Sequence, residues 1–269
     1  MMLQRKHLIH LLSGTRFTMS IPGIEIYRCF DDLGPIRVFE EGSFRYLAFS
    51  EDSQQSAIDL SRPSDLVFEY TQAMMLALLY LPSPKRITIL GLGAGSLFHA
   101  FRQYDSELQI DVAELRPQVI KVAQDWFNLP LDDDRLNIFP VDAQEYMSDF
   151  NGVTDIILAD LYDDNGMLDL QLNTSFIQDC FDALSPDGLL VLNLWDQGKG
   201  SHPKAKQALS KHFDEHCLGC SIDGDNFVVF AFKSGIPQIN DRHLQPLIKK
   251  LSKRLPFSVS ALIRSLRPL

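Results

Sequence analysis

Cysteine is scarce in this sequence: the chain of 269 residues has only Cys29, Cys180, Cys217 and Cys220. So few cysteines in a chain of this size do not indicate a disulfide framework, and a reducing, cytoplasmic location is expected. Long apolar runs are also missing. The longest strongly apolar stretch, residues 73–81, is far too short to cross a bilayer, so stable membrane insertion is not expected. The formal net charge of −10 argues against nonspecific nucleic-acid binding and favours cationic ligands.

The patterning divides the chain into four segments. Residues 1–20 are expected to form a leader, and their apolar run is too short and too broken to be a signal peptide. Residues 21–64 hold aromatic-rich strand patterns separated by turn signals, which predict a small antiparallel β unit. Residues 65–235 form the main domain, and residues 236–269 form a distinct basic tail.

Strand and helix patterns alternate through the main domain. This alternation predicts an α/β, Rossmann-like fold, with a mostly parallel seven-stranded sheet and helices on both faces. We expect helices over 65–80, 94–104, 116–127, 143–150, 174–184 and 204–213. We expect strands over 86–92, 108–115, 135–142, 154–160 and 189–195, followed by a hairpin over 219–232 with Gly224 in its turn.

A glycine-rich turn, GLGAG, ends the first strand of this series and contains Gly91, Gly93 and Gly95. Glycine at such a turn adopts positive φ and lets the backbone approach a ligand closely. The turn is not a phosphate loop, because no Lys-Ser/Thr pair follows it, and it lacks the third glycine of the dinucleotide pattern. Alone, it favours a tight strand-to-helix connection over a ligand site.

Acidic residues end the next three strands in order: Glu114, Asp142 and Asp160. Ligands of doubly wound sheets bind at the carboxyl ends of the strands, so these acids are expected to meet at one site. Glu114 can accept hydrogen bonds from ribose hydroxyls, and Asp142 can accept one from an adenine amino group. Together with the glycine turn, they predict a nucleoside-binding site.

This order of motifs resembles the S-adenosylmethionine-dependent transferase fold and, within it, the spermidine synthase (polyamine aminopropyltransferase) family over about residues 25–232. The N-terminal β unit, the segment EYTQAMM (69–75), the glycine turn, the acids Glu114 and Asp142, and the segment LADLYDD (158–164) carry the resemblance. The resemblance implies that Asp160 takes a proton from the attacking amine.

The same resemblance implies the remaining site residues. It places Asp163, Tyr70 and Gln72 at the amine substrate, although the family has Glu where Gln72 stands. It places Gln55 beside the nucleoside cofactor, with a longer spacing to Tyr70 than in the family. It implies no metal and a small amine or polyamine substrate. Because family members are often dimers, it also allows a homodimer.

The departures from the family pattern lie on the substrate side. Ala94 stands where the family has an Asp that contacts the amine end of decarboxylated S-adenosylmethionine, and LVF (66–68) replaces an acidic Asp-Glu-Phe. An alanine would tolerate the carboxylate of ordinary S-adenosylmethionine, so we expect donor choice to depend on Ala94. Aminopropyl transfer to a polyamine, methyl transfer to an unidentified acceptor and a catalytically silent nucleoside-binding protein all stay open.

Two further patterns have competing interpretations. The segment HFDEHCLGC (212–220) has histidines and cysteines at metal-ligand spacings, but the cysteines enter a strand whose side chains alternate faces, so zinc is not favoured. The tail has seven Lys or Arg and one acid, a net charge of +6 that leaves −16 on residues 1–235. It could bind an anionic surface, but a helix folded back on the acidic body is favoured.

Overall fold

A computed structural model describes most of the chain from residue 21 onward, and residues 1–20, which are expected to form a leader, lie outside the described residues. Only the backbone is described for Asp163 and for residues 241–244. Gly224 and Asp164 also fall outside the described part of the chain. The described ranges are 21–50, 54–130, 132–163, 166–197, 202–222, 225–237 and 241–269.

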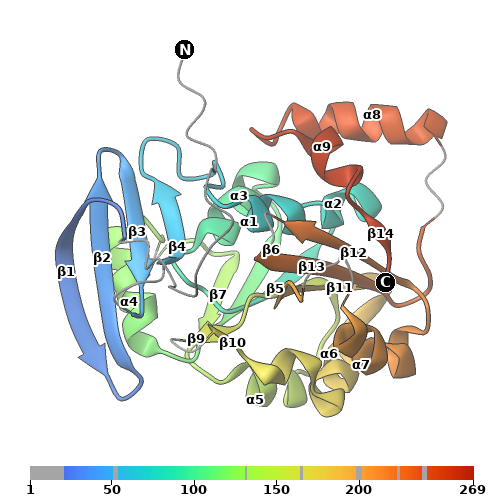
Figure 1. Ribbon diagram of the computed structural model, residues 1–269, viewed down its shortest axis with the longest axis horizontal. Helices are drawn as coiled ribbons and strands as arrows, with labels where there is room; N and C mark the ends of the chain where they lie inside the picture. The colour runs from blue at the N-terminus through green and yellow to red at the C-terminus, as the bar shows by residue number, and fades with distance from the viewer. Residues whose placement is uncertain are drawn as a thin grey trace, which may run out of the picture.

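The N-terminal unit is a four-stranded antiparallel sheet in the order β1-β2-β3-β4 (Figure 1). Its strands are β1 (Ile24–Asp31), β2 (Gly34–Glu41), β3 (Phe44–Ala48) and β4 (Gln54–Asp59). One face buries apolar residues such as Val38 and Leu47 against Val122 and Phe127 at the α4 end of the main domain. This packing fixes the small sheet beside the carboxyl ends of the main strands.

The main sheet has the order β14-β12-β13-β11-β8-β5-β6-β7. The pairs from β11 to β7 are parallel, whereas β13 is antiparallel to both β11 and β12. The chain leaves β5 toward β6 and later returns to β8 on its other side, which places a topological switch point at β5. The strands are β5 (Arg86–Leu90), β6 (Gln109–Ala113), β7 (Leu136–Phe139), β8 (Thr154–Ala159), β11 (Leu184–Trp195), β12 (Cys217–Ile222), β13 (Asn226–Phe232) and β14 (Arg267–Pro268).

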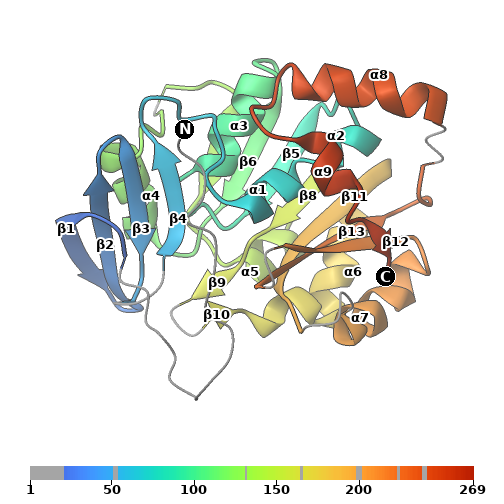
Figure 2. The same cartoon turned by 45° about the horizontal axis from the view of Figure 1, so that its top comes forward.

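Helices cover both faces of this sheet (Figures 1 and 2). One face packs against α1 (Glu69–Met74), α2 (Ala77–Tyr80), α3 (Ser96–Tyr104), α8 (Asp241–Ser252) and α9 (Val259–Ile263). The other face packs against α5 (Ala143–Ser148), α6 (Thr174–Ala183) and α7 (Pro203–Phe213). Near the small sheet lies α4 (Pro117–Trp126), and the short elements β9 (Tyr162–Asp163), β10 (Gly166–Met167) and the 3-10 turn η1 (Asp169–Leu172) follow β8.

The predicted α/β fold with an N-terminal β unit is confirmed, with three local differences. The single helix expected over 65–80 starts only at Glu69, because Leu66 bridges to Ile58 and Phe68 is still extended, and a break at residues 75–76 divides it into two short helices. Residues 185–188, which separate the expected helix over 174–184 from the expected strand over 189–195, lie within β11 as an irregularity of its register with β8. The tail adds an eighth strand, the two-residue β14, which pairs with β12.

The basic tail folds back on the body, as favoured from the sequence. Leu251, Leu255 and Val259 are buried in the core that also holds α1, α2 and α3. Lys249 and Lys253 are exposed, and no ion pair is formed by the tail within the described part of the chain. The contact is therefore chiefly apolar, with a hydrogen bond from the Arg254 guanidinium to the carbonyl of Tyr104 at 3.0 Å. Among the described helices, none combines the length and the apolar character needed to cross a membrane.

Candidate active site

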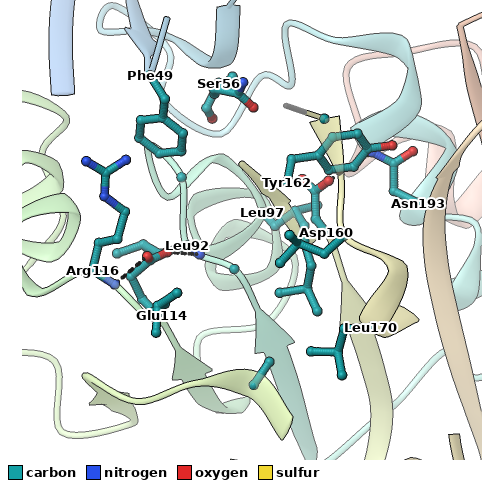
Figure 3. A pocket seen from close by; sticks show the side chains of 18 of the residues that line it. Phe49, Ser56, Leu92, Leu97, Glu114, Arg116, Asp160, Tyr162, Leu170 and Asn193 are labelled. Carbon is teal, nitrogen blue, oxygen red and sulfur yellow. Dashed lines mark hydrogen bonds between the residues drawn. The ribbon is translucent and has the colours of Figure 1, made fainter. Parts of the chain in front are cut away.

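A cavity of about 740 Å³ opens at the carboxyl ends of β5, β6, β8 and β11, next to β4 of the small sheet. This is the crevice at which open α/β sheets bind their ligands. Figure 3 shows two groups of side chains across it, with Glu114, Arg116 and Phe49 on one side and Asp160, Tyr162 and Asn193 on the other. The two sides have different chemistry.

The glycine turn after β5 supplies backbone to the cavity wall. Gly91 has φ +91°, and a Cβ there would lie 2.4 Å from the backbone oxygen of Asp160. Gly93 has φ +55°, and a Cβ there would press on Ser56 of β4. Both line the cavity, so the turn is held tightly between β8 and the small sheet. Gly95 does not line the cavity. It is the N-cap of α3, and a Cβ there would lie 3.3 Å from Cδ1 of Leu129.

Glu114 follows β6 and is 8% exposed at the cavity wall. Its two carboxylate oxygens accept hydrogen bonds from the backbone N–H groups of Leu92 and Arg116, each at 2.9 Å. Burial raises the pKa of Glu114, while these backbone bonds act in the opposite direction. A carboxylate has room for about four hydrogen bonds, so this fixed carboxylate can still accept from a ribose hydroxyl.

Asp142 lines the same side of the cavity and caps α5. Its Oδ1 accepts from the backbone N–H groups of Gln144 at 2.8 Å and Glu145 at 3.2 Å. An N-cap needs only one of the two oxygens, so the other can accept from an amino group such as that of adenine.

Arg116 is the one cation among the described cavity-lining residues, and its charge is already engaged. Its guanidinium donates to both carboxylate oxygens of Asp31, at 2.8 and 2.9 Å, and to the carbonyl of Gly34. It also lies over the ring of Phe49, 4.6 Å from the centroid. Arg116 therefore holds the β1–β2 hairpin at the cavity and has little charge to offer a ligand.

Ala94, to which the sequence assigns the choice of donor, does not line the cavity. Its methyl group is fully buried with Ile36, Val38 and Val119, between the glycine turn and the small sheet. The acid of the family pattern is thus replaced by an apolar contact. Any tolerance for a carboxylate must come from other residues along the cavity.

Asp160 directly follows β8 and is half-buried, with part of its surface open to the cavity. Its Oδ1 accepts from Nδ2 of Asn193 at 2.8 Å, and its Oδ2 accepts from the Tyr70 hydroxyl at 3.2 Å. Burial raises its pKa, and the bonds from Asn193 and Tyr70 lower it. No described cation pairs with it. An unpaired carboxylate in this setting is suited to bind an ammonium group or to accept a proton.

The other predicted residues are placed as follows. Gln55 lines the cavity from β4. Gln72 does not line it, because its side-chain amide donates to the carbonyl of Leu66 at 2.8 Å and fixes the segment before α1. The backbone of Asp163 lies in the β9–β10 hairpin beside the cavity, but its side chain is outside the described atoms.

Sequence reasoning missed a group of polar and aromatic residues around Asp160: Tyr162, Asn193, Asp225 and Asn226. Trp195 also lines the cavity and is 50% exposed, although its place in the sequence favours a core aromatic. The buried Tyr162 hydroxyl lies near the Asn226 amide but makes no hydrogen bond of good geometry with any described residue. One signal was available, since Asn193 is a lone polar residue inside the apolar run LLVLNLW. A polar residue that is 1% exposed in such a strand needs a partner, and Asp160 is that partner.

The two cysteines of the segment HFDEHCLGC (212–220) lie on opposite faces of the main sheet. Cys217 packs in the core on the α6–α7 side of the sheet, and Cys220 packs in the core on the opposite side. Burial raises the pKa of Cys217 to about 12 and of Cys220 to about 11. Both thiols are therefore neutral core groups in this structure.

The sequence is similar to known proteins over most of its length. The sequence matches the spermine/spermidine synthase domain over residues 67–219. It is 32% identical over 234 residues to a polyamine aminopropyltransferase of Neisseria meningitidis, covering 86% of this chain and 89% of that protein. It is 27% identical over 223 residues to an eEF1A lysine and N-terminal methyltransferase of Xenopus laevis, covering 76% of this chain and 32% of that protein.

The fold is shared with a spermidine synthase solved in complex with the transition-state analogue AdoDATO. The TM-score is 0.70 at 22% identity, covering 90% of this chain and 83% of that one. At this identity the likeness supports the fold alone.

Proposed function

Because this chain belongs to the spermine/spermidine synthase family, we propose that it transfers an aminopropyl group from decarboxylated S-adenosylmethionine to an amine of the polyamine class. Family membership makes it a spermidine synthase-like transferase, as its motifs predict. The identity of the donor and that of the acceptor are the proposed part.

The charge of the cavity is the observation that supports this donor. Glu114, Asp142, Asp160 and Asp225 line it, and its one described cation, Arg116, is bonded to Asp31. Decarboxylated S-adenosylmethionine has a sulfonium and an ammonium group and no carboxylate, so an acidic cavity favours it. Ordinary S-adenosylmethionine adds a carboxylate, for which the described lining offers no free cation.

The chemistry follows from the two sides of the cavity. Glu114 and Asp142 hold the adenosine part, so that the sulfonium faces Asp160. The acceptor nitrogen attacks the propyl carbon bonded to sulfur, the C–S bond breaks, and its electron pair stays on sulfur as a neutral thioether. The attacking ammonium must first lose a proton, and in this proposal Asp160 accepts it. Holding nitrogen, carbon and sulfur in line supplies much of the acceleration.

Methyl transfer is a second candidate, supported by α3. This helix begins at Ser96 with no side-chain cap, and Ser96 and Leu97 line the cavity. Uncapped N–H groups at a helix N-terminus attract a carboxylate, such as that of ordinary S-adenosylmethionine. The similarity to a lysine and N-terminal methyltransferase agrees with this reading.

Calorimetric titration with each donor tests the choice between the candidates. We expect the decarboxylated donor to bind at least about 10-fold more tightly, a difference of about 1.4 kcal/mol. Mass spectrometry of putrescine incubated with each donor identifies the transferred group. Equal or tighter binding of ordinary S-adenosylmethionine, with a methylated product, would overturn the aminopropyl proposal.

The role of Asp160 is tested separately by Asp160→Asn. This variant should bind the donor and lose turnover, because an amide cannot take the proton. Asp187→Asn is the matched control, since Asp187 is an exposed residue of β11 that does not line the cavity. Full turnover by Asp160→Asn would remove Asp160 from the mechanism.

A further inference from the structure

Three side chains form a continuous line of hydrogen bonds across neighbouring strands at the cavity. Nδ2 of Asn226, at the start of β13, donates to Oδ1 of Asn193 on β11 at 3.0 Å. Nδ2 of Asn193 donates to Oδ1 of Asp160, just after β8, at 2.8 Å. Asn226 also lines the cavity, but among the described residues its amide bonds to Asn193 and not to Asp160 itself.

From this line we infer that Asn226 is a positioning residue, which acts through Asn193 to fix how Asp160 faces the acceptor amine. The inference rests on the proposed function, in which Asp160 takes the proton. Neither asparagine belongs to the motifs that identify the family in this sequence.

The direction of the line follows from the chemistry of its ends. An ionised carboxylate only accepts hydrogen bonds, so Asn193 must turn its amide nitrogen toward Asp160. The amide oxygen of Asn193 then faces the opposite way, in a residue that is 1% exposed, and it needs a donor. The Asn226 amide supplies that donor.

The backbone of Asn193 is held independently. Nε2 of Gln171, a fully buried residue of η1, donates to the carbonyl of Asn193 at 3.1 Å and to that of Leu161 at 3.2 Å. Gln171 thus joins the ends of β8 and β11 without using the Asn193 side chain. Among the described residues, the orientation of the Asn193 amide is left to Asn226 and Asp160.

The orientation of the Asn193 amide gives the two carboxylate oxygens of Asp160 different hydrogen-bond partners. Asn193 occupies Oδ1 with a short bond, whereas Tyr70 reaches Oδ2 at the longer distance of 3.2 Å. Oδ2 is therefore the oxygen with more capacity for the acceptor amine. A flipped Asn193 would point its oxygen at Oδ1, and the repulsion between lone pairs would disfavour the ionised carboxylate.

Substitution of Asn226 tests this role. Asn226→Ala removes the donor, and Asn226→Asp replaces it with an acceptor in nearly the same shape. We expect kcat/KM near pH 7 to fall about 10-fold or more, because a misoriented base loses part of its effect. We also expect the acidic limb of the pH profile to move to higher pH, because the bond from Asn193 lowers the pKa of Asp160. Donor affinity should stay within about twofold, since Glu114 lies on the other side of the cavity.

Asn137 supplies matched controls on β7. Its Nδ2 donates to the buried carboxylate of Asp111 at 2.8 Å, and it does not line the cavity. Asn137→Ala and Asn137→Asp lose a comparable bond, yet they should leave the pH profile in place. A shift of equal size in these controls would mean that general destabilisation, rather than positioning, explains the Asn226 variants.

Titration of the Asp160 carboxyl followed by ¹³C NMR measures the expected rise in its pKa directly, without relying on turnover. Asn226→Ser, which keeps a short donor, should show a smaller shift than Asn226→Ala and extends the test if the latter folds poorly. An Asp160 titration unchanged in every folded Asn226 variant would overturn the inference. If Asp160→Asn keeps full turnover instead, the proposed function of Asp160 fails, and that outcome is distinct from failure of the positioning role.

Discussion

At the scale of single residues, Asp160 combines two properties that oppose each other. It is a carboxylate surrounded by protein, and its described partners are two neutral donors rather than a cation. Burying an ion without a counter-ion lowers stability, because hydration is lost and only partly replaced. The same surroundings raise the pKa of Asp160 and make it a stronger base for an amine proton. Stability and activity therefore pull in opposite directions at this position.

Asp160→Asn should accordingly stabilise the protein at neutral and alkaline pH while abolishing turnover. The pKa of Asp160 is raised in the folded state, so the wild type loses stability as pH rises from the ordinary Asp value through the raised one. The amide has no such dependence. Thermal melts at pH 8 should show a higher Tm for the variant, and the gap should close as pH falls toward the ordinary Asp value.

Asp155→Asn, on the other end of β8, is the counterpart for this comparison. Asp155 accepts bonds from the backbone N–H groups of Lys85 and Arg86 and from the Ser185 hydroxyl. An amide there loses acceptor capacity, so Tm should drop. If both substitutions lower Tm at pH 8, hydrogen bonds compensate the burial of the Asp160 carboxylate, and the expected gain in stability is wrong.

At the scale of elements, the sequence predicts what depends on local patterns and misses what depends on register. Apolar runs and the acids that end them predict the parallel strands and the cavity, because parallel strands bring their carboxyl ends to one edge. Asn226 is adjacent to Asn193 only because β13 pairs antiparallel with β11 at one particular register. The extended segment at Leu66 was likewise missed, because its pairing with Ile58 overrides helix propensity.

The β9–β10 hairpin is an element whose packing no local pattern indicates. Gly166 has φ +122°, and a Cβ there would lie 2.0 Å from Cζ2 of Trp195. Trp195 is 50% exposed, and its backbone N–H donates to Sδ of Met167 in the same hairpin. Tyr162 pairs with Met167 across the hairpin. The missing side chain at Gly166 thus lets the hairpin lie on the Trp195 ring and sets the position of Tyr162.

Gly166→Ala should push the hairpin or the Trp195 ring aside and weaken binding of the acceptor. We expect KM for the acceptor to rise several-fold, with donor affinity unchanged by calorimetry. Gly42→Ala is the matched control, because Gly42 also has positive φ, at +64°, but a Cβ there meets open space. Equal kinetic effects from both substitutions would attribute the change to backbone strain rather than to the contact with Trp195.

At the scale of the whole molecule, the charge distribution and the packing suggest different ways of attaching the basic tail to the body. The body has a net charge of −16 and the tail +6, a contrast that suggests electrostatic attachment. The structure instead buries Leu251, Leu255 and Val259 of the tail in the core shared with α2, and leaves Lys249 and Lys253 exposed. Exposed charges without close partners contribute little to stability, whereas buried leucines contribute much. The tail therefore belongs to the folded core.

Leu251→Ala should destabilise the protein through the cavity it creates, since Leu251 is 1% exposed. The free energy of unfolding in urea should fall by about 2–5 kcal/mol, whereas Lys249→Ala should change it by no more than about 0.5 kcal/mol. Raising the salt concentration should leave this difference intact, because screening acts on charges and not on apolar contacts. If Lys249→Ala and Lys253→Ala cost as much as Leu251→Ala, and salt removes their effect, the tail is held by charge instead.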